Sequence, residues 1–168
     1  MRHLCCLFLL GGAGLLAQNP LTDSVTARYK SIRENLVAAA EAMPEDGYQF
    51  KLTPAQRSFG GWIGHVAMGN YHFCAIIKGE VAPENPGLHE LTEKAALVKA
   101  ISDSFAYCDA ALLGMTDQKA LSGVTVAGKT VYPVEGMIGL IASTNEHYGN
   151  LVGYLRTKGI TPPSSRKR

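Results

Sequence analysis

Helical periodicity is the feature that most constrains the fold of this chain, because it runs through four long segments and leaves little sequence for strands. In residues 22–43, 58–78, 92–114 and 134–158, apolar side chains recur at steps of three and four, which places them on one face of a helix. Helices of about twenty residues with one apolar face bury that face by packing against one another. The sequence therefore predicts an all-α fold, a four-helix bundle.

Residues that favour helix ends bound these segments. They are Thr22 or Asp23 and Pro44 for the first segment, Gly79 for the end of the second, Thr92 and Gly114 for the third, and Pro133 and Gly159 for the fourth. The second segment follows a possible capping box in residues 52–56, with Pro54 at the first helical position, and we expect a break near Ser58 before its main helix. Between the last two segments, residues 116–133 contain two glycines and the short apolar run Val124-Thr125-Val126. We predict that this stretch is a long crossover loop before the last helix, with room for a small extended pair.

The N-terminus has the pattern of a secretory signal. Arg2 and His3 precede an uncharged, mostly apolar run from Leu4 to Leu16, and Ala17 follows at a plausible cleavage point. The run is too short for an ordinary membrane span, which needs about 20 residues. We predict a signal peptide over residues 1–17, one bundle domain over residues 18–168, and export to a periplasm. The alternative is a retained N-terminus, disordered or anchored.

The charge balance excludes two classes of partner. A formal net charge of +2 is too small to indicate nucleic-acid binding. No basic amphipathic stretch indicates a membrane-surface role. We therefore expect neither nucleic acid nor membrane among the partners.

Two cysteines, Cys74 and Cys108, follow the predicted signal peptide, and both fall on apolar positions of helical segments. There a free cysteine packs as a small hydrophobic residue. In an oxidising compartment the two could form a disulfide instead. The pattern favours packed thiols and leaves the disulfide as the alternative.

The best functional clue is a pair of histidines on the inner faces of two different helices. His147 lies centrally on the apolar stripe of the last helix, and His65 lies at the edge of the stripe of the second. A buried imidazole needs a partner, because an unsatisfied polar group in a core costs about 1–3 kcal/mol. The partner can be a hydrogen bond or a shared Zn, Ni or Fe ion, which neutral imidazoles suit. By contrast, we expect His72 and His89 to be exposed.

Four stretches of this chain resemble the DinB family of DinB/YfiT-like metalloenzymes, in the right order along residues 22–165. They are RSFGGWIGHVA at residues 57–67, the pair Asn70-Tyr71, EHYGN at residues 146–150 and KGITPPSS at residues 158–165. The resemblance implies a four-helix bundle with a long connection, often a homodimer. It also implies a divalent metal held by one histidine of the second helix and a His-x-x-x-His pair of the last. Characterised relatives include thiol-dependent transferases and isomerases.

Carried over by position, His65 matches the ligand of the second helix and His147 the second member of the pair. The first member falls on Ser143. A neutral hydroxyl is a poor ligand for such ions, so we expect metal binding to be weak or absent. We therefore expect an exported, non-catalytic or weakly metal-binding bundle that binds a small molecule or dimerises. The alternative is a metal-dependent enzyme, similar to the thiol transferases and isomerases, that uses His65 and His147.

Overall fold

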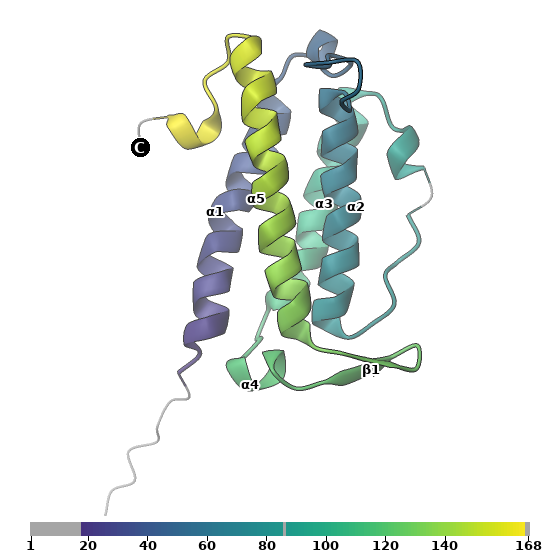
Figure 1. The fold of residues 1–168 in the computed structure, drawn as a ribbon, viewed down its shortest axis with the longest axis vertical. Coiled ribbons are helices and arrows are strands. Elements are labelled where there is room, and N and C mark those ends of the chain that lie inside the picture. Colours follow the sequence, from purple (N-terminus) through teal and green to yellow (C-terminus); the bar gives the residue numbers. More distant parts are fainter. Residues whose placement is uncertain (1–17, 86, 167–168) are drawn as a thin grey trace, which may run out of the picture.

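The computed structural model describes residues 18–85 and 87–166 (Figure 1). The predicted signal peptide, residues 1–17, lies outside the described residues. In the part of the chain that is described, no helix is long and apolar enough to cross a membrane.

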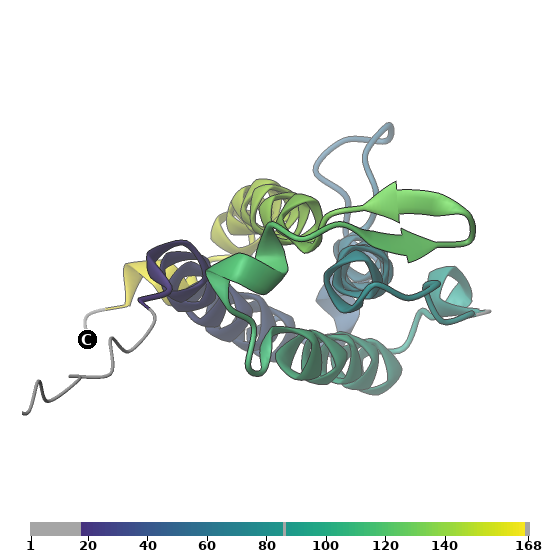
Figure 2. The ribbon, with the colours of Figure 1, turned by 90° about the horizontal axis from the view of Figure 1, so that it is seen from below.

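Four long helices form the bundle, as predicted. They are α1 (Pro20–Ala42), α2 (Phe59–Lys78), α3 (Lys94–Leu112) and α5 (Pro133–Thr157). Seen along the helix axes, α2 packs between α3 and α5, and α1 closes the bundle by packing against the same two helices (Figure 2). This arrangement places α2 and α5 side by side, which matters because each contributes one histidine to the site.

Short elements connect the long helices. They are the 3-10 turns η1 (Glu45–Gly47), η2 (Leu88–Glu90) and η3 (Pro163–Ser165), the single turn α4 (Asp117–Ala120), and the strands β1 (Val124–Val126) and β2 (Lys129–Val131). The two strands pair antiparallel, with Val124 opposite Val131. Ala127 and Gly128 between them have φ of 48° and 79°, the left-handed backbone of a tight hairpin. The crossover loop and its extended pair are therefore confirmed.

The predicted break near Ser58 and the predicted end at Gly79 are confirmed for α2. The expected capping box in residues 52–56 is wrong, because these residues form a turn and the helix begins only at Phe59. The Ser58 hydroxyl accepts a hydrogen bond from the Gly61 amide at 3.1 Å, and Gly79 ends the helix with φ of 69°. The start of α1 differs. The sequence predicts Thr22 or Asp23 as its cap, whereas the helix begins at Pro20.

A distant carboxylate explains this earlier start. Asp117 accepts hydrogen bonds from the amides of Leu21 and Thr22, at 3.1 and 2.8 Å, and from the Thr22 hydroxyl at 2.9 Å. These contacts supply partners for amide groups that the first turn of a helix leaves unsatisfied. Since Asp117 belongs to α4, they also tie the start of α1 to the crossover.

The preference for packed thiols is wrong, because Cys74 of α2 and Cys108 of α3 form a disulfide. Their Cα atoms are 5.2 Å apart, inside the range of about 4.4–6.8 Å that a disulfide spans. Both cysteines are fully buried, as their apolar positions predicted. The bond joins two of the four long helices about one turn before the end of each.

Candidate metal and ligand site

Helices α2 and α5 run antiparallel, side by side (Figure 1). They bring His65 and His147 together, with their ring centroids 4.9 Å apart. Gly136 permits this close packing, because a Cβ at that position would lie 2.6 Å from the Phe73 carbonyl oxygen of α2. His147 is 9% exposed and His65 is half-buried. The predicted approach of the two imidazoles inside the bundle is confirmed.

Trp62 completes an aromatic cluster around the pair. Its ring centroid lies 5.9 Å from that of His65 and 5.1 Å from that of His147. The indole nitrogen donates a hydrogen bond to the Tyr154 hydroxyl at 3.2 Å, and that hydroxyl donates to the Arg57 carbonyl at 2.5 Å. The Arg57 guanidinium lies over the indole, 5.1 Å from its centroid. The sequence analysis did not predict the contacts that Arg57 and Tyr154 make with Trp62.

Burial and charge keep both imidazoles neutral near pH 7. Burial lowers the pKa of His65 below its usual 6.5, and the positive charge of Arg57 and the neighbouring His147 lower it further. Burial also lowers the pKa of His147, and Arg57 acts in the same direction against the opposing charge of Glu146. A neutral imidazole has a free nitrogen lone pair, which is the form that binds metal.

The Nδ1 atom of His147 is buried and has no hydrogen-bond partner within the described residues. Such an atom costs about 1–3 kcal/mol if it stays unpaired. A nitrogen left in this state, with a second imidazole beside it, is chemically suited to a divalent ion. The structure therefore brings together the two histidines that match ligand positions in the family resemblance.

Ser143 faces the same space between α2 and α5. Its hydroxyl oxygen lies 3.7 Å from where a Cβ at Gly69 would stand, and Gly69 follows His65 by one helical turn. Within residues 18–85 and 87–166, no group of three or more His, Cys, Asp or Glu side chains could hold a metal ion. The donor set is therefore two neutral nitrogens and one neutral hydroxyl, which fits such an ion only in part.

Comparison with known proteins identifies the family. The model of the DinB superfamily matches residues 28–149, a range that includes His65, Ser143 and His147. The chain belongs to the DinB superfamily. No curated protein matches it.

Solved structures of DinB-like proteins share the fold. The Bacillus subtilis protein YjoA is 21% identical with a TM-score of 0.67, over 86% of this chain and 99% of its own. A DinB-like protein from Bacillus cereus is 14% identical with a TM-score of 0.67, over 84% and 95%. YfiT from Bacillus subtilis, described as a probable metal-dependent hydrolase with an unusual four-helix bundle topology, is 13% identical with a TM-score of 0.60, over 86% and 91%. At these identities the likeness shows the fold alone.

Beside the imidazole pair, this DinB bundle has a cleft of about 400 Å³ between the start of α2, the segment before it and η2. Lys51, Arg57, His65 and His89 line it. His72 and His89 are both exposed, as predicted, but His89 shares this cleft with His65. Sequence reasoning missed the cleft, because its charged residues lie in connecting segments without periodicity.

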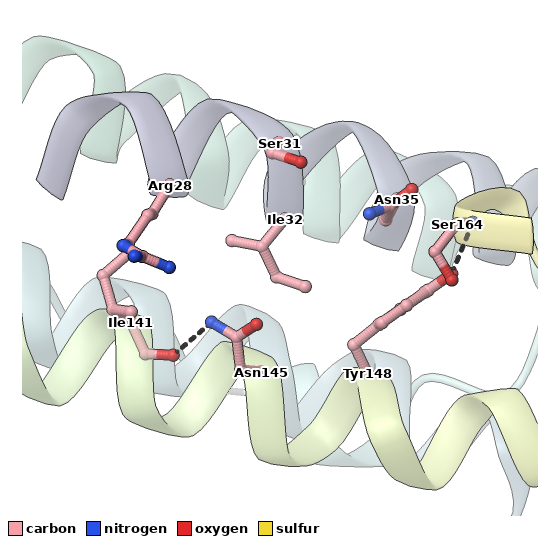
Figure 3. Close-up of a pocket in the computed structure, with 8 residues that line it drawn as sticks. All are labelled: Arg28, Ser31, Ile32, Asn35, Ile141, Asn145, Tyr148 and Ser164. Carbon is pink, nitrogen blue, oxygen red and sulfur yellow. Dashed lines mark hydrogen bonds between the residues drawn. The ribbon is translucent and has the colours of Figure 1, made fainter. Parts of the chain in front are cut away.

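A second cavity, of about 360 Å³, lies between α1 and α5 (Figure 3). Arg28 and Asn145 point into it from opposite helices, and the Tyr148 hydroxyl closes one end by donating to the Ser164 hydroxyl at 2.9 Å. Asn145 donates its amide to the Ile141 carbonyl at 2.8 Å. Neither histidine of the pair lines this cavity, so it is separate from the candidate metal site.

Proposed function

We propose that His65 and His147 are two ligands of an incomplete divalent-metal site, and that the protein is a weakly metal-binding, non-catalytic member of the DinB superfamily. The observation that carries this proposal is the close pair of neutral imidazoles with an unpartnered, buried Nδ1 on His147. The description of YfiT as a probable metal-dependent hydrolase supports an ion in this fold. The serine at position 143 supports weak binding, because a neutral hydroxyl binds Zn or Ni poorly.

The absence of an orienting carboxylate supports a non-catalytic role. Within the described residues, neither His65 nor His147 makes a hydrogen bond to an Asp or Glu side chain. Metal-binding histidines usually donate their second nitrogen to a carboxylate, a backbone carbonyl or a water, which fixes the ring and makes the ligand more basic. A pair without this support holds an ion less firmly and activates a bound water less.

Replacement of the serine tests the proposal directly. Ser143→His would place two imidazoles one turn apart on α5, facing His65, as in other i, i+4 metal-binding pairs. The missing side chain at Gly69 provides part of the space. In calorimetric titrations with Zn and Ni at pH 7.5, we expect this variant to bind at least about tenfold more tightly than the natural protein. Loss of a residue that only hydrogen-bonds to a ligand already costs about 10–100-fold in metal affinity, so gain of a direct ligand should matter at least as much.

Two variants serve as controls for that titration. Asn145→His adds an imidazole at an exposed position of α5 that faces α1 rather than α2, and should leave the affinity unchanged. Adding His147→Ala to Ser143→His should remove the gain. Tight stoichiometric binding by the natural protein, unchanged by Ser143→His, would contradict the proposal, because another ligand would then complete the site.

A metal-dependent enzyme, such as a thiol transferase or isomerase, is the alternative. The observation that favours it is the cleft beside His65, which has room for a substrate next to the imidazole pair. Turnover of a thiol or ester substrate that requires added metal and is lost in His65→Ala would establish this alternative. Unchanged turnover in His65→Ala would exclude the pair from any reaction observed.

We also propose that the protein is exported. The Cys74–Cys108 disulfide supports this proposal, because disulfides persist in oxidising compartments and are rare in the cytosol. Mass spectrometry of the native protein should find an N-terminus near Gln18, and an intact N-terminus would contradict export. The homodimer that the family resemblance implies stays a prediction, which sedimentation velocity can test.

A further inference from the structure

The cleft beside His65 is built around positive charge. Lys51 and Arg57 lie on its rim, the imidazoles of His65 and His89 line it, and no Asp or Glu does. The ion pairs of the described residues are Arg33–Asp109, Lys78–Glu80 and Lys99–Asp103, so neither Lys51 nor Arg57 has a carboxylate partner. Neither of these two cations is therefore held in an ion pair with a carboxylate of the described residues.

Stacking holds Arg57 in place while leaving its donors free. The guanidinium lies over the Trp62 ring, 5.1 Å from its centroid, and forms no side-chain hydrogen bond among the described residues. Because a stacked guanidinium uses its face, its N–H edge stays available for a planar or tetrahedral oxyanion. Trp62 is itself fixed by its hydrogen bond to Tyr154, so Arg57 is partly preorganised.

Hydrogen-bond donors for a ligand in the cleft have to come from side chains, because the backbone amides at the start of α2 are already paired. The amides of Phe59 and Gly60 already donate to the carbonyls of Phe50 and Tyr48, and the Gly61 amide donates to Ser58. The 3-10 turn η2 can approach α2 closely across the cleft because residue 64 is a glycine. A Cβ at that position would lie 3.1 Å from the Leu88 carbonyl oxygen of η2. The result is a hollow of about 400 Å³, within the range of about 300–1,000 Å³ typical of small-molecule sites.

We propose that this cleft binds the oxyanion group, carboxylate or phosphate, of a small molecule, held by Lys51 and Arg57 with the rest of the molecule directed at His65. Charge-assisted hydrogen bonds to such groups are stronger than neutral ones. The cavity between α1 and α5 offers one cation, Arg28, which makes it the poorer anion site. The proposal goes beyond the metal site and does not need a metal ion at the imidazole pair.

The test is an NMR titration of the full-length, metal-free protein with three probes: inorganic phosphate, benzoate and neutral benzamide. We expect phosphate, benzoate or both to shift the amide signals of residues 51, 57, 61, 65 and 89. Binding of phosphate alone or of benzoate alone identifies which oxyanion the cleft prefers. Benzamide should cause no comparable shifts, because it lacks the charge.

Removal of positive charge tests whether the anion binds in the cleft or is only attracted to the protein's surface charge in general. Lys51→Gln/Arg57→Gln should weaken binding of the preferred probe at least about tenfold, because two charge-assisted contacts are lost. Lys30→Gln/Lys129→Gln removes the same charge from exposed positions elsewhere and should change the affinity less than about threefold, the effect of screened surface charge. Equal weakening in both variants, or shifts confined to other regions, would overturn the proposal.

A last variant separates this proposal from the metal site. His147→Phe removes a proposed metal ligand that does not line the cleft and keeps a ring against Trp62, on which Arg57 stacks, so anion binding should persist with little change. If His147→Phe abolishes anion binding, the anion occupies the imidazole pair and the cleft proposal fails. If anion binding persists while metal titrations show no binding, the cleft proposal stands and the metal proposal fails.

Discussion

The disulfide between α2 and α3 should contribute strongly to stability. Its cysteines are separated by 34 residues in the sequence. Closing a loop of that length lowers the entropy of the unfolded chain by about 13 cal/mol/K, or about 4 kcal/mol at 25 °C, in the chain-entropy treatment. For a domain of this size, a loss of about 4 kcal/mol corresponds to a melting temperature lower by about 8–16 °C.

Two perturbations separate loop closure from packing. Reduction of the natural protein keeps both sulfur atoms, so the oxidised and reduced forms should differ by the loop term alone. Cys74→Ala/Cys108→Ala removes the bond and also the buried sulfur atoms, so it should be somewhat less stable than the reduced protein. Alanine is the appropriate substitute, because serine would bury two hydroxyl groups at fully enclosed positions.

The assay is urea unfolding followed by circular dichroism, with and without a reductant present during both unfolding and refolding. A non-reducing tryptic map should contain one cross-linked species that joins residues 58–78 to residues 100–119, since no other lysine or arginine interrupts these peptides. Alkylatable thiols on both peptides, or an unfolding midpoint that the reductant does not move, would refute the reasoning.

Three further substitutions test other contacts by thermal unfolding. Gly136→Ala should destabilise the protein by about 1–3 kcal/mol, because the new methyl would meet the Phe73 carbonyl oxygen. Gly149→Ala on the same helix should stabilise it by about 0.5–1 kcal/mol, because nothing lies within 4 Å. Burial alone would raise the pKa of Asp117, but hydrogen bonds from Thr22 and Leu21 hold it below 3.8. The contribution of this carboxylate is therefore present above pH 3.8 and lost as the pH falls through its folded pKa, so the melting temperatures of the natural protein and Asp117→Asn should converge in acid.

Local signals made much of the fold predictable. The bounds of α2 follow from Ser58 and Gly79, which act within one turn of the helix that they end. The hairpin in the crossover follows from residues 124–131 alone. By contrast, α1 begins at Pro20 because Asp117, nearly a hundred residues away, accepts hydrogen bonds from its first turn. Nothing in the sequence around Pro20 indicates that contact.

The candidate site was predictable to the same extent. Periodicity places His65 and His147 on inner faces, and it places Cys74 and Cys108 on buried positions. Periodicity does not state how far one helix is shifted along its neighbour, and that shift decides whether two buried cysteines meet. The cationic cleft was missed for another reason, because Lys51 lies in a connecting segment where an exposed charge is ordinarily just solvated.

Gly136 of α5 and Gly69 of α2 lie on facing helices, but close packing requires a glycine only at position 136. At Gly136 packing demands a glycine, since a side chain would meet the backbone of α2 at 2.6 Å. At Gly69 it does not, since the nearest atom, the Ser143 hydroxyl oxygen, would be 3.7 Å away, an ordinary contact. A glycine inside a helix costs up to about 1 kcal/mol relative to alanine. The helices need no close approach at Gly69 to offset that cost. The glycine instead leaves room for about one methyl group beside the Ser143 hydroxyl, one turn from His65, and this is part of the space that an imidazole at position 143 would need.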